Sequence, residues 1–325
     1  MADDNASPSP SSDSPLQHHR DAVKSSVLLA ALRGKGSQKK KIEVLRALRR
    51  LLSQSKVPPV DAAIKAGAVP LLVQYLSFGS PDEQLLEAAS CLTNIVAGEP
   101  EETKSLLPAL PLLIAHLGEK SSVLVTEQCA WAIGNVAGEG AELRSKLLAQ
   151  GALRPLTHLM LSNKDSTART SAWALSNLIK GPDPKAAIEL ISIDGVLNAI
   201  IRNLEKAYDE ELATEVAWVV VYLSALSERA ISLIVRSSVP QLLIGRLLSS
   251  NNLQLLIPVL RGLGNLVASD GYMVDSVLIV GNIITGKLMI LFRPYHVCDD
   301  WMMSIYELTV YCLFGEYFSF ANCLY

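Results

Sequence analysis

The chain has 325 residues, of which 50% are hydrophobic, 19% charged and 6% aromatic. Because half of the residues are apolar, the composition excludes a disordered chain and provides for a large core. The net charge of −3 combines a basic start (11 basic and 5 acidic side chains in residues 1–60) with an acidic middle (15 and 21 in residues 61–250). Nucleic-acid binding requires a positive face, so this distribution argues against a nucleic-acid partner and favours a basic one.

The chain begins MADDNASPSPSSDSP, which is rich in serine and proline, and we predict a disordered tail over residues 1–25. This segment lacks the apolar run of a signal peptide, and no stretch of 18 uncharged apolar residues occurs later in the chain. Five cysteines without a C-x-x-C pair indicate neither a zinc site nor a disulfide framework. We therefore expect an intracellular protein without a membrane span, a metal or a cofactor.

Residues 26–286 contain an internal repeat of about six units. One column of this repeat advances in steps of 41, 42, 45 and 43 residues, through Asn94, Asn135, Asn177, Tyr222 and Asn265. One further step back leads to Arg50. Such an interval is typical of armadillo and HEAT solenoids, whose units stack on one another.

The repeated segments have the pattern of amphipathic helices. LLEAASCLTNIV, TEQCAWAIGNVA and ARTSAWALSNLI place apolar residues at i, i+3, i+4 and i+7, with no proline inside. Gly98, Gly138 and Gly181 follow at positions where a helix commonly ends. Because no alternating pattern of strand length recurs, we predict an all-α fold, a right-handed armadillo-repeat superhelical solenoid of about six repeats.

The composition changes after Gly286, since residues 287–325 contain 10 of the 18 aromatic side chains. The similar segment GNIITG at 281–286 is out of register, because Asn282 lies only 17 residues after Asn265. We therefore predict an atypical aromatic tail after the sixth repeat and no seventh repeat.

Tryptophan and asparagine recur four residues apart, at Trp131/Asn135 and Trp173/Asn177, with Trp218/Tyr222 as a variant. Residues at i and i+4 share one face of a helix. A carboxamide can bind a peptide backbone through both its donor and its acceptor. Neighbouring indoles can hold the stems of lysine or arginine, with cation–π energies of about 0.5–2 kcal/mol each. The pattern therefore predicts a receptor for an extended basic peptide, and no motif suggests an enzyme.

Two other interpretations stay open. A single tryptophan on an amphipathic helix is more often part of the core, and the asparagines could form a structural ladder between repeats. Repetition favours a binding role, because asparagine is a mediocre helix former and is costly to bury without a partner. The basic residues of 35–50 are interpreted as the solvated face of the opening helices.

The segments LLEAASCLTNIVAG, TEQCAWAIGNVAGEG, ARTSAWALSNLIKG and LIPVLRGLGNLVA resemble consecutive armadillo repeats of importin-alpha, the adaptor that recognises nuclear localisation signals. The resemblance covers roughly residues 37–286 and looks closest to a divergent branch of that family. It implies a nuclear import adaptor, present in cytoplasm and nucleus, that binds lysine- and arginine-rich signals of cargo proteins in a concave groove. An armadillo scaffold without transport activity is the alternative.

The resemblance also implies which residues bind the signal. The positions that match the family's major groove are Asn94, Gly98, Thr103, Gln128, Trp131, Asn135, Glu139, Trp173 and Asn177. Among them, Glu139 occupies the acidic position that pairs with the key lysine of the signal. Positions that match the minor groove are Glu215, Trp218, Tyr222, Arg261 and Asn265.

Departures from the family pattern modify this expectation. Ser90 stands in the tryptophan column of repeat two, so one wall of the lysine slot is missing, and Thr170 replaces a polar amide. The basic segment that binds importin-beta in the family has no clear counterpart, so we expect binding to importin-beta to be weak or lost. Without repeats after the sixth, the minor groove is at best half-built.

Overall fold

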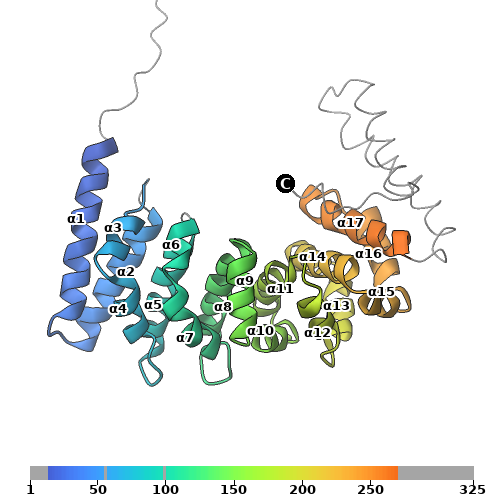
Figure 1. Ribbon diagram of the computed structural model, residues 1–325, viewed down its shortest axis with the longest axis horizontal. Helices are drawn as coiled ribbons and strands as arrows, with labels where there is room; N and C mark the ends of the chain where they lie inside the picture. The colour runs from blue at the N-terminus through green and yellow to red at the C-terminus, as the bar shows by residue number, and fades with distance from the viewer. Residues whose placement is uncertain (1–13, 55–56, 98–99, 270–325) are drawn as a thin grey trace, which may run out of the picture. The chain divides into compact units, whose positions relative to one another are not determined.

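The computed structural model describes residues 14–54, 57–97 and 100–269, and within these ranges the chain forms helices and turns without any strand (Figure 1). The chain divides into two compact units, Met1–Gln150 and Gly151–Tyr325. The all-α prediction is confirmed for the described residues. The predicted aromatic tail, 287–325, lies outside them.

The first unit contains nine α-helices and one short 3-10 helix in its described residues. They are α1 (Ser14–Arg33), α2 (Gln38–Gln54), α3 (Val60–Lys65), α4 (Ala68–Tyr75), α5 (Asp82–Val96), α6 (Pro100–Lys104), η1 (Leu107–Ala109), α7 (Leu110–Ala115), α8 (Val123–Gly138) and α9 (Ala141–Ala149). The second unit continues with α10 (Leu153–Met160), α11 (Asp165–Ile179), α12 (Lys185–Ile191), α13 (Val196–Glu205), α14 (Glu210–Leu226), α15 (Glu228–Val235), α16 (Val239–Ser249) and α17 (Leu253–Ser269).

A long helix follows two short ones in each full repeat, and the long helices pack against one another. In the first unit α5 lies between α2 and α8, and in the second unit α14 lies between α11 and α17. The apolar position two residues before the asparagine column is buried in every long helix: Leu48, Leu92, Ile133, Leu175, Val220 and Leu263. The helical spacing of the sequence therefore provides the core between repeats.

The predicted tail at residues 1–25 is wrong for its second half, because α1 begins at Ser14. Leu29 and Leu32 are buried where α1 packs on α2 and α3, and Ser25 is fully buried as well. A helix anchored at one end extends with one additional hydrogen bond per residue, which explains why serine- and histidine-containing sequence joins it.

The glycines with positive φ do not lie at the ends of the long helices, where the sequence predicted helix-ending glycines. Gly138 is the last residue of α8, and neither it nor Gly181 has a positive φ. Instead, Gly67 (φ 78°) and Gly195 (φ 87°) precede the second helix of their repeats. A Cβ on Gly67 would lie 2.9 Å from Arg33 Nη2, the mobile end of a long side chain, so it is the backbone conformation that favours glycine there.

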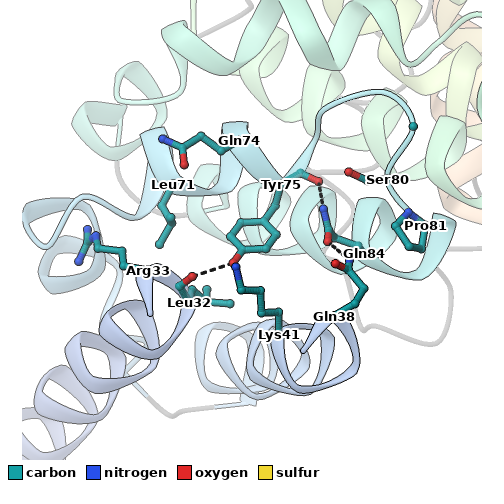
Figure 2. A pocket seen from close by; sticks show the side chains of 11 residues that line it. Leu32, Arg33, Gln38, Lys41, Leu71, Gln74, Tyr75, Ser80, Pro81 and Gln84 are labelled. Atoms are coloured by element: carbon teal, nitrogen blue, oxygen red, sulfur yellow. Dashed lines mark hydrogen bonds between the residues drawn. The ribbon is translucent and has the colours of Figure 1, made fainter. Parts of the chain in front are cut away.

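Polar side chains in the first unit bind carbonyl groups at the end of a helix in the preceding repeat. The Tyr75 hydroxyl donates to Leu32 O at 2.8 Å, as Figure 2 shows. His116 Nε2 lies 2.6 Å from Leu76 O, and Nδ1 lies 2.7 Å from Ser121 Oγ. Because a carbonyl only accepts, Nε2 carries the proton and Nδ1 accepts from the serine hydroxyl.

The second unit repeats this contact with arginine as the donor. Arg202 Nη2 donates to Leu161 O at 2.9 Å, and Arg246 Nε donates to Leu204 O at 3.0 Å. The last carbonyls of a helix have no partner within the helix, so these side chains complete the helix ends while they join adjacent repeats.

No single helix among the described residues is long and apolar enough to cross a membrane; the pair Glu228–Val235 and Val239–Ser249, bent by 74°, passes by length and composition only.

One buried group in α13 predicts a stabilising substitution. The amide of Asn203 is fully buried, and the described residues offer no hydrogen bond to Nδ2 or Oδ1. Asn203→Leu keeps the approximate shape and removes the unsatisfied groups, so it should raise the free energy of unfolding by about 1–3 kcal/mol in urea denaturation. Asn198→Leu, at an exposed position of the same helix, is the control and should change it by less than about 0.5 kcal/mol. If Asn203→Leu is less stable than the wild type, the Asn203 amide has a hydrogen-bond partner in solution and the prediction is wrong.

Candidate functional site

The long helix α8 presents one exposed stripe made of residues in the repeated columns. Trp131 is 53% exposed, Asn135 is half-buried, and Glu139, which directly follows the helix, is exposed. Positions 132–134 and 136–137 between them are buried. The Trp131 indole is therefore in solvent, which excludes the alternative that it belongs to the core.

The second unit carries the corresponding residues on α11 and α14. Trp173 and Asn177 are half-buried on α11. On α14, the rings of Trp218 and Tyr222 stack with centroids 6.0 Å apart and planes at 23°. The Arg261 guanidinium, from α17, lies 5.5 Å from the centre of the Trp218 ring. The tryptophan column of this unit is thus accessible rather than enclosed, and one of its faces already binds a cation.

The asparagine column has a structural role that the sequence left open. Asn94 Nδ2 donates to Arg49 O at 3.2 Å, and Asn265 Nδ2 donates to Val221 O at 3.1 Å and to Ser224 Oγ at 3.2 Å. Each contact joins a long helix to the long helix of the preceding repeat. A ladder between repeats therefore exists at these two asparagines, and it uses the amide protons and leaves the carbonyl oxygens.

Two expected binding residues are engaged within the protein. Thr103 is only 1% exposed, and its hydroxyl donates to Val96 O at 3.3 Å, so its side chain does not reach a surface peptide. Gln128 is half-buried, and its Nε2 donates to Thr93 Oγ1 at 2.7 Å. Gly98 lies outside the described residues.

The sequence did not predict one arginine–glutamate cluster. It is made of Arg46 and Arg49 on α2 with Glu83 and Glu87 on α5. Arg46 Nε lies 3.3 Å from Glu87 Oε1, Arg49 Nε lies 2.6 Å from Glu87 Oε2, and Arg46 Nη2 also pairs with Glu83. These two arginines are therefore not the freely solvated face that we expected. The available signal was opposite charge about one repeat interval apart.

Glu215, on α14, is the residue with a shifted pKa among those that the resemblance assigned to the grooves. Burial raises the pKa of its carboxyl to about 7, and Glu211 acts in the same direction, while Arg169 opposes the shift. Arg169 forms an ion pair with Glu211. The Glu215 carboxyl is thus partly protonated near neutral pH and gains its charge within the physiological range.

A pocket of about 550 Å³ lies between α1, α2, α4 and the start of α5 (Figure 2). Its polar groups bind one another: Gln84 Nε2 donates to Tyr75 O at 3.0 Å, and Lys41 lies 5.7 Å from the centre of the Tyr75 ring. Among the described residues, no group of three or more histidine, cysteine, aspartate or glutamate side chains is placed to hold a metal ion. The exposed columns of the long helices are therefore the stronger candidate for a functional site.

Comparison with known proteins agrees with this repeat geometry. The model of the armadillo/beta-catenin-like repeat matches residues 56–97 and 140–180. Importin subunit alpha-2 of Oryza sativa subsp. japonica is 67% identical over a 357-residue alignment that covers 89% of this chain and 67% of that protein. Importin subunit alpha-9 of Arabidopsis thaliana is 67% identical over 246 residues, which cover 76% of this chain and 47% of that protein. The chain thus spans between about half and two thirds of the length of these relatives.

A solved structure shows the same fold. The designed armadillo repeat protein YIII(Dq.V1)4CPAF, in complex with the peptide (KR)4, is 25% identical and covers 74% of this chain with a TM-score of 0.64. The predicted armadillo-repeat array is therefore confirmed. The two relatives at 67% identity place the repeats in one family, and the chain belongs to the importin-alpha family.

Proposed function

We propose that the chain is a nuclear import adaptor, active between cytoplasm and nucleus, which binds the lysine- and arginine-rich localisation signals of cargo proteins. The observation that carries the proposal is the exposed stripe of α8, in which an indole, a carboxamide and a carboxylate follow one another at Trp131, Asn135 and Glu139. These groups bind a peptide without changing it chemically, so the protein acts as a receptor and not as an enzyme.

The asparagines provide the clamp for the peptide backbone. Because the preceding repeat holds the amide protons of Asn94 and Asn265, these side chains are oriented before a ligand arrives. Among the described residues, no donor binds either Oδ1, and no hydrogen bond engages the amide of Asn135. An extended peptide can donate its N–H groups to these oxygens, and each bond contributes about 0.5–1.5 kcal/mol.

The tryptophans provide the slots for cationic side chains. The Arg261 guanidinium over the Trp218 ring is an internal example of the contact that a signal residue would make. Because Arg261 already covers Trp218, we assign the slots for incoming lysine or arginine to Trp131 and Trp173. Glu139, exposed one turn after Asn135, adds a charge that favours a cationic head.

The basic start of the array supports weak coupling to importin-beta. Arg46 and Arg49 are engaged in ion pairs with α5 and are not available as part of a carrier-binding segment. The other basic side chains that are exposed in residues 35–50 are Lys35, Lys39, Lys40 and Arg50, and four charges supply only part of the charge of such a segment.

A fluorescent lysine-rich peptide tests the proposal by anisotropy titration. Wild-type protein should bind it with an affinity that falls as salt is added. Trp131→Ala combined with Asn135→Ala should weaken binding at least about tenfold, because an indole contact and a backbone hydrogen bond together contribute more than about 1.4 kcal/mol. Tyr208→Ala, which removes an exposed aromatic ring outside the repeated columns, should leave the affinity unchanged. Equal binding by all three proteins, or no binding by the wild type, would contradict the proposal.

The carboxyl of Glu215 predicts a pH dependence. Its pKa of about 7 means that it is largely protonated at pH 6 and ionised at pH 8. A peptide cation held near it favours the ionised form, so affinity should rise about two- to fivefold between pH 6 and pH 8. Glu215→Gln should flatten the profile, whereas Glu228→Gln, at an exposed position on α15, should not. A slope that persists in Glu215→Gln would assign the effect to another group.

A further inference from the structure

We infer that the arginine–glutamate cluster prevents cationic side chains of a peptide from binding at repeat two, beside α5. In the first unit, the basic residues of the peptide are therefore recognised only at α8. This inference rests on the proposed function and adds a determinant of specificity to it. The ligand class that it predicts is a peptide with a short basic run, whose residue opposite repeat two is neutral.

The cluster neutralises the carboxylates that a peptide would otherwise use. Both oxygens of Glu87 are engaged, one by Arg46 at 3.3 Å and the other by Arg49 at 2.6 Å. The Glu87 side chain is 9% exposed, so little of it is left for a ligand. Glu83 is more exposed, and it pairs with Arg46.

The position of the cluster in the repeat makes it relevant to binding. Arg46 precedes Arg50 by four residues, as Trp131 precedes Asn135, and Glu87 lies three residues before Ser90, as Gln128 lies before Trp131. The cluster therefore occupies the columns that carry the indole and its neighbour in repeat three. Ser90 provides no ring there, so the cluster replaces a cation slot with an internal ion pair.

The same cluster is tied to the backbone clamp. The Arg49 guanidinium donates to Glu87, and the Arg49 carbonyl oxygen accepts a hydrogen bond from Asn94 Nδ2 at 3.2 Å. Asn94 can thus bind the backbone of a peptide at a position where the side chains of the protein select no charge.

Exchange of ion pairs explains why a cation gains little at this position. A peptide lysine that approached Glu87 would have to separate it from two guanidinium groups, and one partly buried charge pair would be replaced by another. A neutral residue requires no such exchange. By contrast, the described residues show no ion pair at Glu139 on α8, so a lysine there adds a new charge interaction.

Two carboxylates can be compared directly with the lysine-rich peptide. Glu139→Gln should weaken binding about five- to tenfold, whereas Glu83→Gln should change it by less than about twofold, because only Glu139 gains a partner from the ligand. A loss of several-fold in Glu83→Gln would overturn the inference, since it would show that the peptide uses the repeat-two carboxylate.

A second experiment removes an arginine of the cluster, so that the carboxylates of repeat two become available to a peptide lysine. Arg46→Gln releases Glu83 and one oxygen of Glu87, so binding of a peptide with six consecutive lysines should tighten about three- to tenfold. Arg50→Gln, an exposed arginine on the same helix for which the described residues show no ion pair, removes the same charge and should give less than about twofold. Equal gains from both variants would mean a general charge effect and would overturn the inference.

The outcomes separate this inference from the proposed function. If wild-type protein binds no basic peptide, the proposed function fails. If it binds and Glu139→Gln weakens binding, but Glu83→Gln also weakens it several-fold or Arg46→Gln gains no more than Arg50→Gln, the function stands and the closed position fails. Thermal unfolding of each variant identifies loss of fold, and Glu83→Gln tests the inference even if Arg46→Gln unfolds.

Discussion

The array depends on one recurring interaction, a polar side chain that donates to a backbone carbonyl of the preceding repeat. Tyr75 and Arg246 do this at the C-terminal ends of α1 and α13, and Asn94 and Asn265 do it between long helices. Donor and acceptor lie 42 to 45 residues apart in these contacts. Because apolar packing alone has no fixed direction, such directional contacts are what hold the repeats in register.

The same interaction prepares the face that we propose to bind the peptide. A side chain that is already held by its neighbour loses little conformational freedom when a ligand binds, so more of the interaction energy contributes to affinity. Asn94 shows this arrangement, with one amide proton bound to Arg49 O inside the protein and its side-chain oxygen left as an acceptor. The structural role of the asparagine column and its proposed role in binding are therefore two uses of one side chain.

Charge is distributed along this face by pairing as well as by composition. Glu87 and Glu139 are both acidic residues near the repeated columns, yet one is enclosed by two arginines and the other is exposed. Trp218 and Trp131 differ in the same way, because Arg261 covers the first and the second stands in solvent. Internal arginines thus decide which copies of a repeated residue are available to a ligand.

The sequence by itself determined the helices, the repeat interval and the columns, because helical periodicity places residues at i and i+4 on one face whatever the surroundings. It therefore predicted that Trp131 and Asn135 share one face of α8, and the structure leaves that face accessible; Glu139 came from the family resemblance alone. It misplaced Thr103, residues 14–25 and the two arginines of the cluster, all of which depend on packing. Which amide protons are used, and which carboxylates are neutralised, was decided only by the tertiary structure, because those contacts join residues about one repeat apart and exist only when the long helices are stacked.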